Sequence, residues 1–214
     1  MKRLRQGIGG ILLLFAIIIC NGARPFAIYA LAAFLHELGH IIAAKMQKIK
    51  LKEIKIGILG VRIETGERMM SYKNELLIAI AGPATNLLTA LIILAGAKIS
   101  GYALTELFDG ASELLHSGQS DALGYIGFFA ISSLAHAVTN LMPIKRLDGG
   151  RALYCTVAAI SSERVAETVL TVTTALSLFA IWTIALYLML RISSGIGIYA
   201  FAAFIFLSTL RDDK

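Results

Sequence analysis

The chain has few charged residues for its length. Charged residues make up 16% of its 214 positions, whereas hydrophobic residues make up 57% and the mean hydropathy is +0.75. In an ordinary soluble domain about a quarter of the residues are charged, so this composition excludes that class. We therefore expect an integral membrane protein.

Cysteine is scarce as well. The two cysteines, Cys20 and Cys155, lie far apart in the sequence, in or beside apolar stretches. This spacing argues against a disulfide framework and a thiolate metal site, so core packing is the expected role of both. The sequence also lacks internal repeats, low-complexity tracts and long linkers, and it predicts one membrane domain over residues 1–214.

Long apolar runs, in contrast, are abundant. Several approach the ~20 residues that a helix needs to cross a bilayer, so they predict an all-α polytopic membrane protein with about six transmembrane helices. The first run follows Lys2, Arg3 and Arg5, as in a signal peptide, but no small-residue cleavage pattern follows it, which indicates an uncleaved helix. The runs cover residues 7–22, 25–45, 75–97, 122–142, 165–190 and 194–209.

The charges are unevenly distributed along the chain. Residues 45–73 are rich in lysine and arginine, whereas residues 98–121 hold four acidic residues and one lysine. Because lysine and arginine accumulate on the cytosolic side of a membrane, both termini and the 45–73 segment are predicted to be cytosolic. This bias accounts for the net charge of +6, which requires no nucleic acid partner.

One segment alternates as a β-strand does. Isoleucine recurs at every second position from Ile54 to Ile58, and the alternation resumes after Gly60. The pattern predicts a small membrane-associated β-hairpin over residues 49–64, between the second and third helices. The alternative is a solvated basic loop whose lysines only fix the topology.

Two histidines and a glutamate interrupt the second apolar run. His36, Glu37 and His40 fit the pattern H-E-x-x-H, in which a helix places both imidazoles on one face, within reach of one zinc ion. Ionisable residues inside a membrane helix usually mark a functional site. The alternative is that the three are polar packing residues in a helix bundle. A catalytic zinc takes three protein ligands, so one more ligand is expected elsewhere.

Asp148 is the expected third ligand. It follows the fourth apolar run, which by the charge bias ends at the cytosolic face, where the histidine motif also ends. Pro143, Gly149 and Gly150 predict a broken or looped backbone here, which membranes tolerate where it lines a cavity. The alternative is that Asp148 only caps a helix that begins near Gly149.

Three motifs in this order resemble the site-2 protease family of intramembrane zinc metalloproteases: HELGH at 36–40, AGPATN at 81–86 and NLMPIKRLDGG at 140–150. The resemblance implies one catalytic zinc ion, held by His36, His40 and Asp148. It also implies that Glu37 is the general base and acid, and that Asn140 positions the substrate or its oxyanion. The third-helix motif is expected to serve close helix packing near the site; its residues are Gly82, Pro83 and Asn86.

The same resemblance implies a zinc metalloendopeptidase that cleaves transmembrane segments of membrane proteins within the lipid bilayer. It covers a catalytic core of about residues 25–155. Neither a PDZ insertion nor a C-terminal nucleotide-sensing domain is expected. Regulation by such domains is therefore excluded, and separate membrane proteins are the expected regulators. The layout is most similar to the sporulation stage IV FB-like subgroup, and the active site is expected nearer the cytosolic face.

Two other interpretations of these residues are open. One is a polytopic ion or proton transporter in which the same histidine, glutamate and aspartate side chains form an ion path. The other is a catalytically silent relative that keeps the fold. His136 lies one helical turn before Asn140, without a ligand partner at metal spacing, and a hydrogen-bonded core histidine is favoured over one that faces the site.

Overall fold

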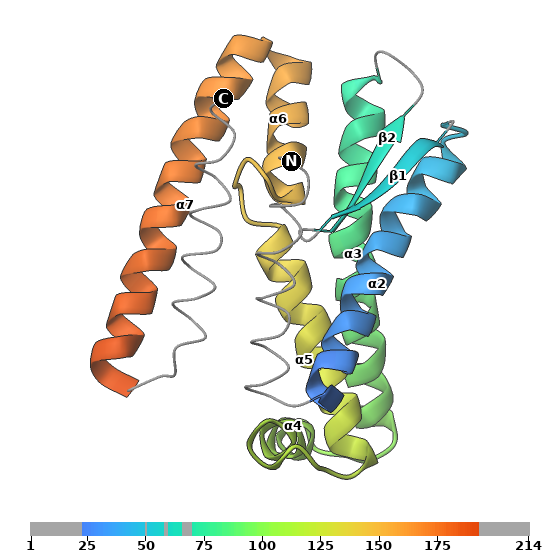
Figure 1. Ribbon diagram of the computed structural model, residues 1–214, viewed down its shortest axis with the longest axis vertical. Helices are drawn as coiled ribbons and strands as arrows, with labels where there is room; N and C mark the ends of the chain where they lie inside the picture. The colour runs from blue at the N-terminus through green and yellow to red at the C-terminus, as the bar shows by residue number, and fades with distance from the viewer. Residues whose placement is uncertain (1–22, 50, 58–59, 66–69, 193–214) are drawn as a thin grey trace, which may run out of the picture. The chain divides into compact units, whose positions relative to one another are not determined.

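The computed structural model describes residues 23–49, 51–57, 60–65 and 70–192, and it forms six helices and two strands within them. Strands β1 (Leu51–Gly57) and β2 (Gly60–Thr65) lie between α2 and α3 in the chain (Figure 1). The predicted spans at 7–22 and 194–209, and Cys20, lie outside the described residues. The helices are α2 (Ala23–Met46), α3 (Tyr72–Ile99), α4 (Leu104–Ser117), α5 (Ala122–Asn140), α6 (Asp148–Ile160) and α7 (Glu163–Ile192).

Four of these helices are long and apolar enough to cross a membrane: α2, α3, α5 and residues Glu163–Ile184 of α7. The 24 residues of α2 extend about 36 Å at 1.5 Å per residue, which exceeds a hydrocarbon core of about 30 Å. Large hydrophobic side chains are exposed along all four helices, as lipid contact requires. The four helices coincide with the apolar runs that the sequence predicts between residues 25 and 190, and a polytopic membrane protein is confirmed.

The described residues fall into two compact units. The first contains the residues up to 69 together with 81–138, and the second contains residues 70–80 together with those from 139 onward. In the first unit, β1 pairs antiparallel with β2, with Ile54 opposite Ile63 and Ile56 opposite Val61. β2 contacts α2. The two strands lie in the segment whose alternating pattern predicts a hairpin.

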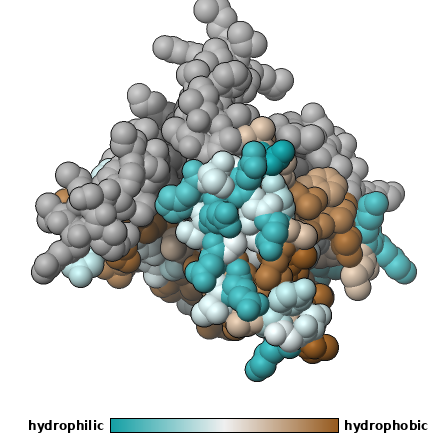
Figure 2. Space-filling model, turned by 90° about the horizontal axis from the view of Figure 1, so that it is seen from below, coloured by the Kyte–Doolittle hydropathy of each residue, from teal (hydrophilic) through white to brown (hydrophobic). Residues whose placement is uncertain are grey.

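Helix α4 lies in the acidic segment between α3 and α5, where the sequence predicts no membrane span. It is too short to cross a membrane, and it buries Leu107, Ala111 and Leu114 on one face against α5 residues such as Phe128. Gly118 ends the helix with a left-handed backbone (φ 71°), and its N–H donates to the carbonyl of Leu114. Seen from this end of the molecule, hydrophilic residues gather over α4 (Figure 2). Such an amphipathic helix suits the membrane surface.

In the second unit, α6 and α7 pack side by side and run in opposite directions (Figure 1). The Nε atom of Arg151 on α6 lies 2.8 Å from Oε1 of Glu75, in the first turn of α3. Cys155 on α6 is fully buried, and this burial raises the pKa of its thiol to about 11. The thiol is therefore protonated at neutral pH, which agrees with the packing role that the sequence predicts for Cys155.

Candidate metal centre

Helix α2 brings the two histidines of the H-E-x-x-H motif together. His36 and His40 are one helical turn apart and only 3% and 7% exposed. Their Nε2 atoms lie 3.2 Å apart, and their ring planes meet at 83°. Two imidazole nitrogens bound to a tetrahedral zinc, each at about 2.0–2.1 Å from the metal, lie about 3.3 Å apart. The pair therefore fits the spacing that a zinc ion requires.

Glycine at position 82 lets α3 approach these imidazoles. A Cβ atom on Gly82 would lie 2.9 Å from Nε2 of His36 and in steric overlap with Nε2 of His40. Gly39 on α2 lies equally close to α3, since a Cβ there would be 2.7 Å from the carbonyl oxygen of Ala81. The third-helix motif thus lies against the histidine pair, at a distance that leaves no room for a side chain.

A third histidine adjoins the pair. The ring of His136 on α5 meets the ring of His36 edge to face, with centroids 5.4 Å apart, and it meets Tyr29 on α2 in the same way at 5.0 Å. His136 therefore faces the candidate metal centre, the orientation that the sequence analysis disfavours. No prediction from the sequence includes Tyr29, although its position seven residues before His36 places it on the same face of α2.

Glu37 lies between His36 and His40 in the sequence and is partly buried. Successive helical residues are turned by about 100°, so its carboxyl group leaves α2 beside the histidine face rather than opposite to it. A carboxylate in this position is available for proton transfer at the metal centre.

Asp148 belongs to the second unit, where it is the first residue of α6. The helix cap is Leu147, whose side chain makes no capping hydrogen bond, so Asp148 is not the N-cap residue of this helix. The predicted break is present at residues 141–147, but the prediction of looped backbone is wrong for Asp148 and the two glycines after it, which are helical. Asn140 is the last residue of α5.

The two glycines are needed for close approach rather than for an unusual backbone conformation. A Cβ on Gly149 would lie 2.7 Å from the carbonyl oxygen of Met142, and one on Gly150 would lie 2.5 Å from the carbonyl carbon of Ile144. The loop at 141–147 therefore passes directly over the first turn of α6. From the sequence alone these glycines indicate only backbone freedom, because a sequence does not reveal such a neighbour.

Thr174 on α7 holds this loop. Its hydroxyl oxygen accepts a hydrogen bond from the backbone N–H of Lys145 at 3.0 Å, and its hydroxyl group donates to the carbonyl of Pro143 at 3.5 Å. Thr174 is 6% exposed, and Ile144 between the two bonded residues is 1% exposed. No signal in the sequence identifies Thr174, because its partners lie about thirty residues away in the chain.

Comparison with known proteins yields consistent matches. The model of peptidase family M50 matches residues 26–182. A Synechocystis sp. protein named as a zinc metalloprotease is 29% identical over 140 residues, which cover 62% of this chain and 33% of that protein. Rip2 of Mycobacterium tuberculosis, also named as a zinc metalloprotease, is 32% identical over 98 residues, which cover 46% of this chain and 32% of Rip2.

The fold has a counterpart among solved structures. The site-2 protease from Methanocaldococcus jannaschii superposes with a TM-score of 0.62 over 98% of this chain and 88% of that one, at 17% identity. At this identity the likeness shows the fold alone. The matched region spans about a third of the length of each of the two metalloproteases named above. Because the family model matches residues 26–182 of the 214, this chain belongs to peptidase family M50.

Proposed function

We propose that this chain is a zinc metalloendopeptidase that cleaves transmembrane segments of other membrane proteins, as in regulated intramembrane proteolysis. The observation that carries the proposal is the buried pair of imidazole Nε2 atoms, 3.2 Å apart, on a membrane-spanning helix of an M50 chain. The zinc metalloprotease names of the relatives point to the same chemistry. In the described part of the chain, nothing favours the alternative of an ion or proton transporter.

The proposed ligands are His36, His40 and Asp148, which hold one zinc ion. His36 and His40 offer their imidazole nitrogens from the first unit, and Asp148 offers a carboxylate oxygen from the second. The donor set of two neutral imidazoles and one carboxylate is typical of catalytic zinc, which keeps its fourth position open. His136 is not proposed as a ligand, because no group of possible metal ligands among the described residues includes it.

A bound zinc ion supplies Lewis-acid chemistry, which activates water and polarises the scissile carbonyl. Glu37 accepts a proton from the attacking water and then donates it to the nitrogen of the leaving amine. The side-chain amide of Asn140 donates a hydrogen bond to the carbonyl oxygen as negative charge develops there. The products are a carboxyl group and an amine, one on each fragment of the cleaved segment.

The proposed depth of the centre follows from helix geometry. At 1.5 Å per residue, His40 lies about 8 Å and His36 about 14 Å along α2 from Lys45, which marks the cytosolic end in the predicted orientation. The catalytic centre is thus proposed to lie in the cytosolic half of the bilayer, with both chain termini in the cytosol. Separate membrane proteins are proposed as regulators of access.

A transmembrane helix cannot be cleaved as it stands, because its backbone groups are hydrogen-bonded internally and no extended peptide is offered. We propose that an edge of the β1–β2 hairpin binds the unwound segment by strand addition, which replaces the lost hydrogen bonds. Proline at Ile54 or Ile56 removes a backbone donor and is expected to reduce cleavage at least tenfold, whereas Ile54→Val is expected to leave cleavage unchanged. Normal cleavage by folded proline variants would contradict strand addition.

The proposed activity is tested by co-expression with single-span candidate substrates. Glu37→Gln removes the proton acceptor but no zinc ligand, so cleavage is expected to fall by about 10²–10⁴ while zinc content stays at one ion per chain. His40→Ala is expected to lose both cleavage and zinc. His116→Gln serves as the matched control, because His116 is exposed on α4 and bonds to the carbonyl of Ser112. Cleavage by Glu37→Gln at the wild-type rate would refute the proposal.

A further inference from the structure

Two polar side chains in the first unit are fully buried and have no hydrogen-bond partner within the described residues. They are Asn86 on α3 and Ser133 on α5, each 0% exposed. Neither the nitrogen nor the oxygen of the Asn86 amide is paired, and the same holds for the Ser133 hydroxyl. A buried polar group without a partner is costly, and the hydrocarbon of a bilayer offers none.

Both side chains lie on helix faces that point toward the histidine pair. Asn86 follows Gly82 by four residues, and Gly82 touches both imidazoles. Ser133 precedes His136 by three residues, and His136 contacts His36. Residues three or four apart occupy the same face of a helix, so Asn86 and Ser133 both face α2.

The helix directions place the two at one level. α2 and α5 run in one direction and α3 runs in the other (Figure 1). Asn86 follows Gly82 along α3, and Ser133 precedes His136 along α5. Because α3 and α5 run in opposite directions, both residues are displaced from the histidines in the same direction, by about one helical turn toward the α4 end. The α2 residue at this level is Ala32, which is fully buried and small.

We infer that Asn86 and Ser133 form a binding site for internal water, one helical turn beyond the histidine pair and away from the cytosolic end. An amide that donates two hydrogen bonds and accepts two, beside a hydroxyl that does both, suits a water molecule, which takes two to four polar partners. The lack of a charged side chain at either position argues against an ion. Full burial argues against a polypeptide segment, which would need both polar groups to be accessible.

The site gives water a place inside the membrane next to the reaction that consumes it. Hydrolysis of each peptide bond uses one water molecule, whose hydroxyl joins the carbonyl carbon and whose remaining proton goes to the amine. This role rests on the proposed function, whereas the binding of water does not. A test that observes the water itself therefore separates the failure of one from the failure of the other.

The test is a structure of the full chain in lipid nanodiscs, at a resolution at which ordered water is visible. Wild type is expected to show water within hydrogen-bonding distance, about 2.7–3.2 Å, of the Asn86 amide and the Ser133 hydroxyl. The double variant N86L/S133A is expected to lose this density while the 3.2 Å spacing of the histidine pair persists. Thr89→Val is the control, because the Thr89 hydroxyl already donates to the carbonyl of Thr85.

Two results would overturn the inference. One is a wild-type structure in which apolar side chains pack around Asn86 and Ser133 without ordered water, and the other is a peptide segment bound to Asn86. If Asn86→Leu fails to fold, the structure of the single variant Ser133→Ala provides a second test. Ser133→Ala alone is then expected to lose the water bound at residue 133, and unchanged density would count against the site. If both single variants fold, their melting temperatures provide a further test. Because one water molecule bound by both side chains can be lost only once, the sum of the two single-variant losses in melting temperature is expected to exceed the loss of the double variant.

Discussion

At the scale of single residues, Gly82 permits the contact between α3 and the face of α2 that carries His36 and His40. An added methyl group would overlap His40 and approach His36. Gly82→Ala is therefore expected to displace at least one imidazole, to weaken zinc binding and to lower cleavage at least tenfold, because small misplacements at a metal centre are costly. The measurement is zinc content after dialysis against a graded series of chelator concentrations, together with the cleavage rate.

Gly96 provides the matched control on the same helix. A Cβ at that position would meet nothing within 4 Å, so Gly96→Ala is expected to retain zinc and activity. Because alanine favours a helix over glycine, this variant is expected to gain about 0.5–1 kcal/mol of stability. If Gly82→Ala bound zinc as tightly as Gly96→Ala does, the close packing of α3 would have no part in holding the ligands.

The residues of the histidine pair can be predicted from sequence because their relation is local. A spacing of four residues on one helix fixes His36 and His40 on one face, whatever surrounds them. The orientation of His136 depends instead on how α5 is rotated against α2, which no local pattern encodes. Its contact with His36 therefore becomes visible only in the folded protein.

At the scale of elements, the loop at 141–147 depends on one side chain of α7. Thr174→Val keeps the shape of the side chain but leaves the N–H of Lys145 without its acceptor in a partly buried setting. A buried donor without a partner costs about 1–3 kcal/mol, so a clear fall in melting temperature is expected. Because the loop leads directly into Asp148, zinc affinity is expected to fall as well.

Thr174→Ser separates the hydroxyl group from the methyl group. Serine keeps both hydrogen bonds to the loop, so this variant is expected to retain zinc affinity and to lose only the small stability of one buried methyl group. Equal zinc affinities in the valine and serine variants would show that the loop is positioned by other contacts.

Helices with a long apolar run can be predicted from the sequence, whereas shorter helices are missed. The apolar runs of α2, α3, α5 and α7 are each long enough to cross a bilayer, so the sequence alone predicts these four helices. No apolar run of membrane-spanning length covers α4, so no prediction from the sequence includes it, although Leu107, Ala111 and Leu114 recur at helical spacing. The start of α6 was misjudged because two glycines in succession usually indicate a turn.

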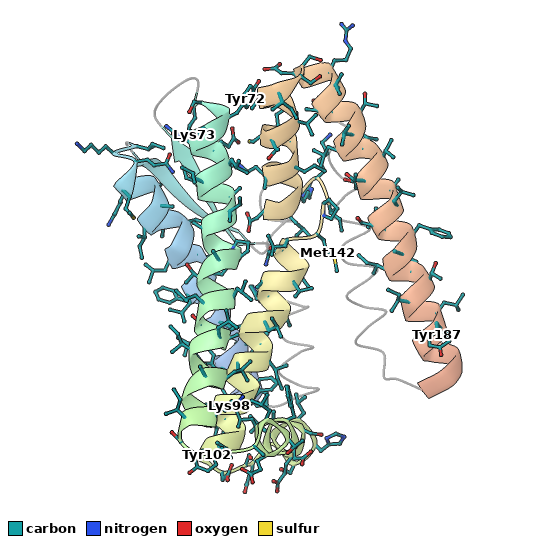
Figure 3. The ribbon with its side chains drawn as sticks, turned by 180° about the vertical axis from the view of Figure 1, so that it is seen from behind. Tyr72, Lys73, Lys98, Tyr102, Met142 and Tyr187 are labelled. Atoms are coloured by element: carbon teal, nitrogen blue, oxygen red, sulfur yellow. The ribbon has the colours of Figure 1, made fainter. Side chains whose placement is uncertain are left out.

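At the scale of the whole molecule, orientation in the membrane decides from which side water and substrate would reach the proposed metal centre. The basic segment at 45–73 and the acidic segment at 98–121 predict that α3 begins in the cytosol and ends outside. Lys73 and Lys98 lie near the two ends of this helix (Figure 3), and both are exposed. A cysteine at either position therefore reports the side on which that end of α3 lies.

The prediction concerns labelling of intact cells with a membrane-impermeant maleimide, in a chain whose own Cys20 and Cys155 are replaced by serine and alanine. Lys98→Cys is expected to react in intact cells, and Lys73→Cys only after the membrane is permeabilised. This outcome would put the first turn of α3 and the end of α2 in the cytosol, and hence His40 about 8 Å from that face. The reverse pattern would put the histidine pair in the outer half of the bilayer, where substrate and water would have to enter from outside.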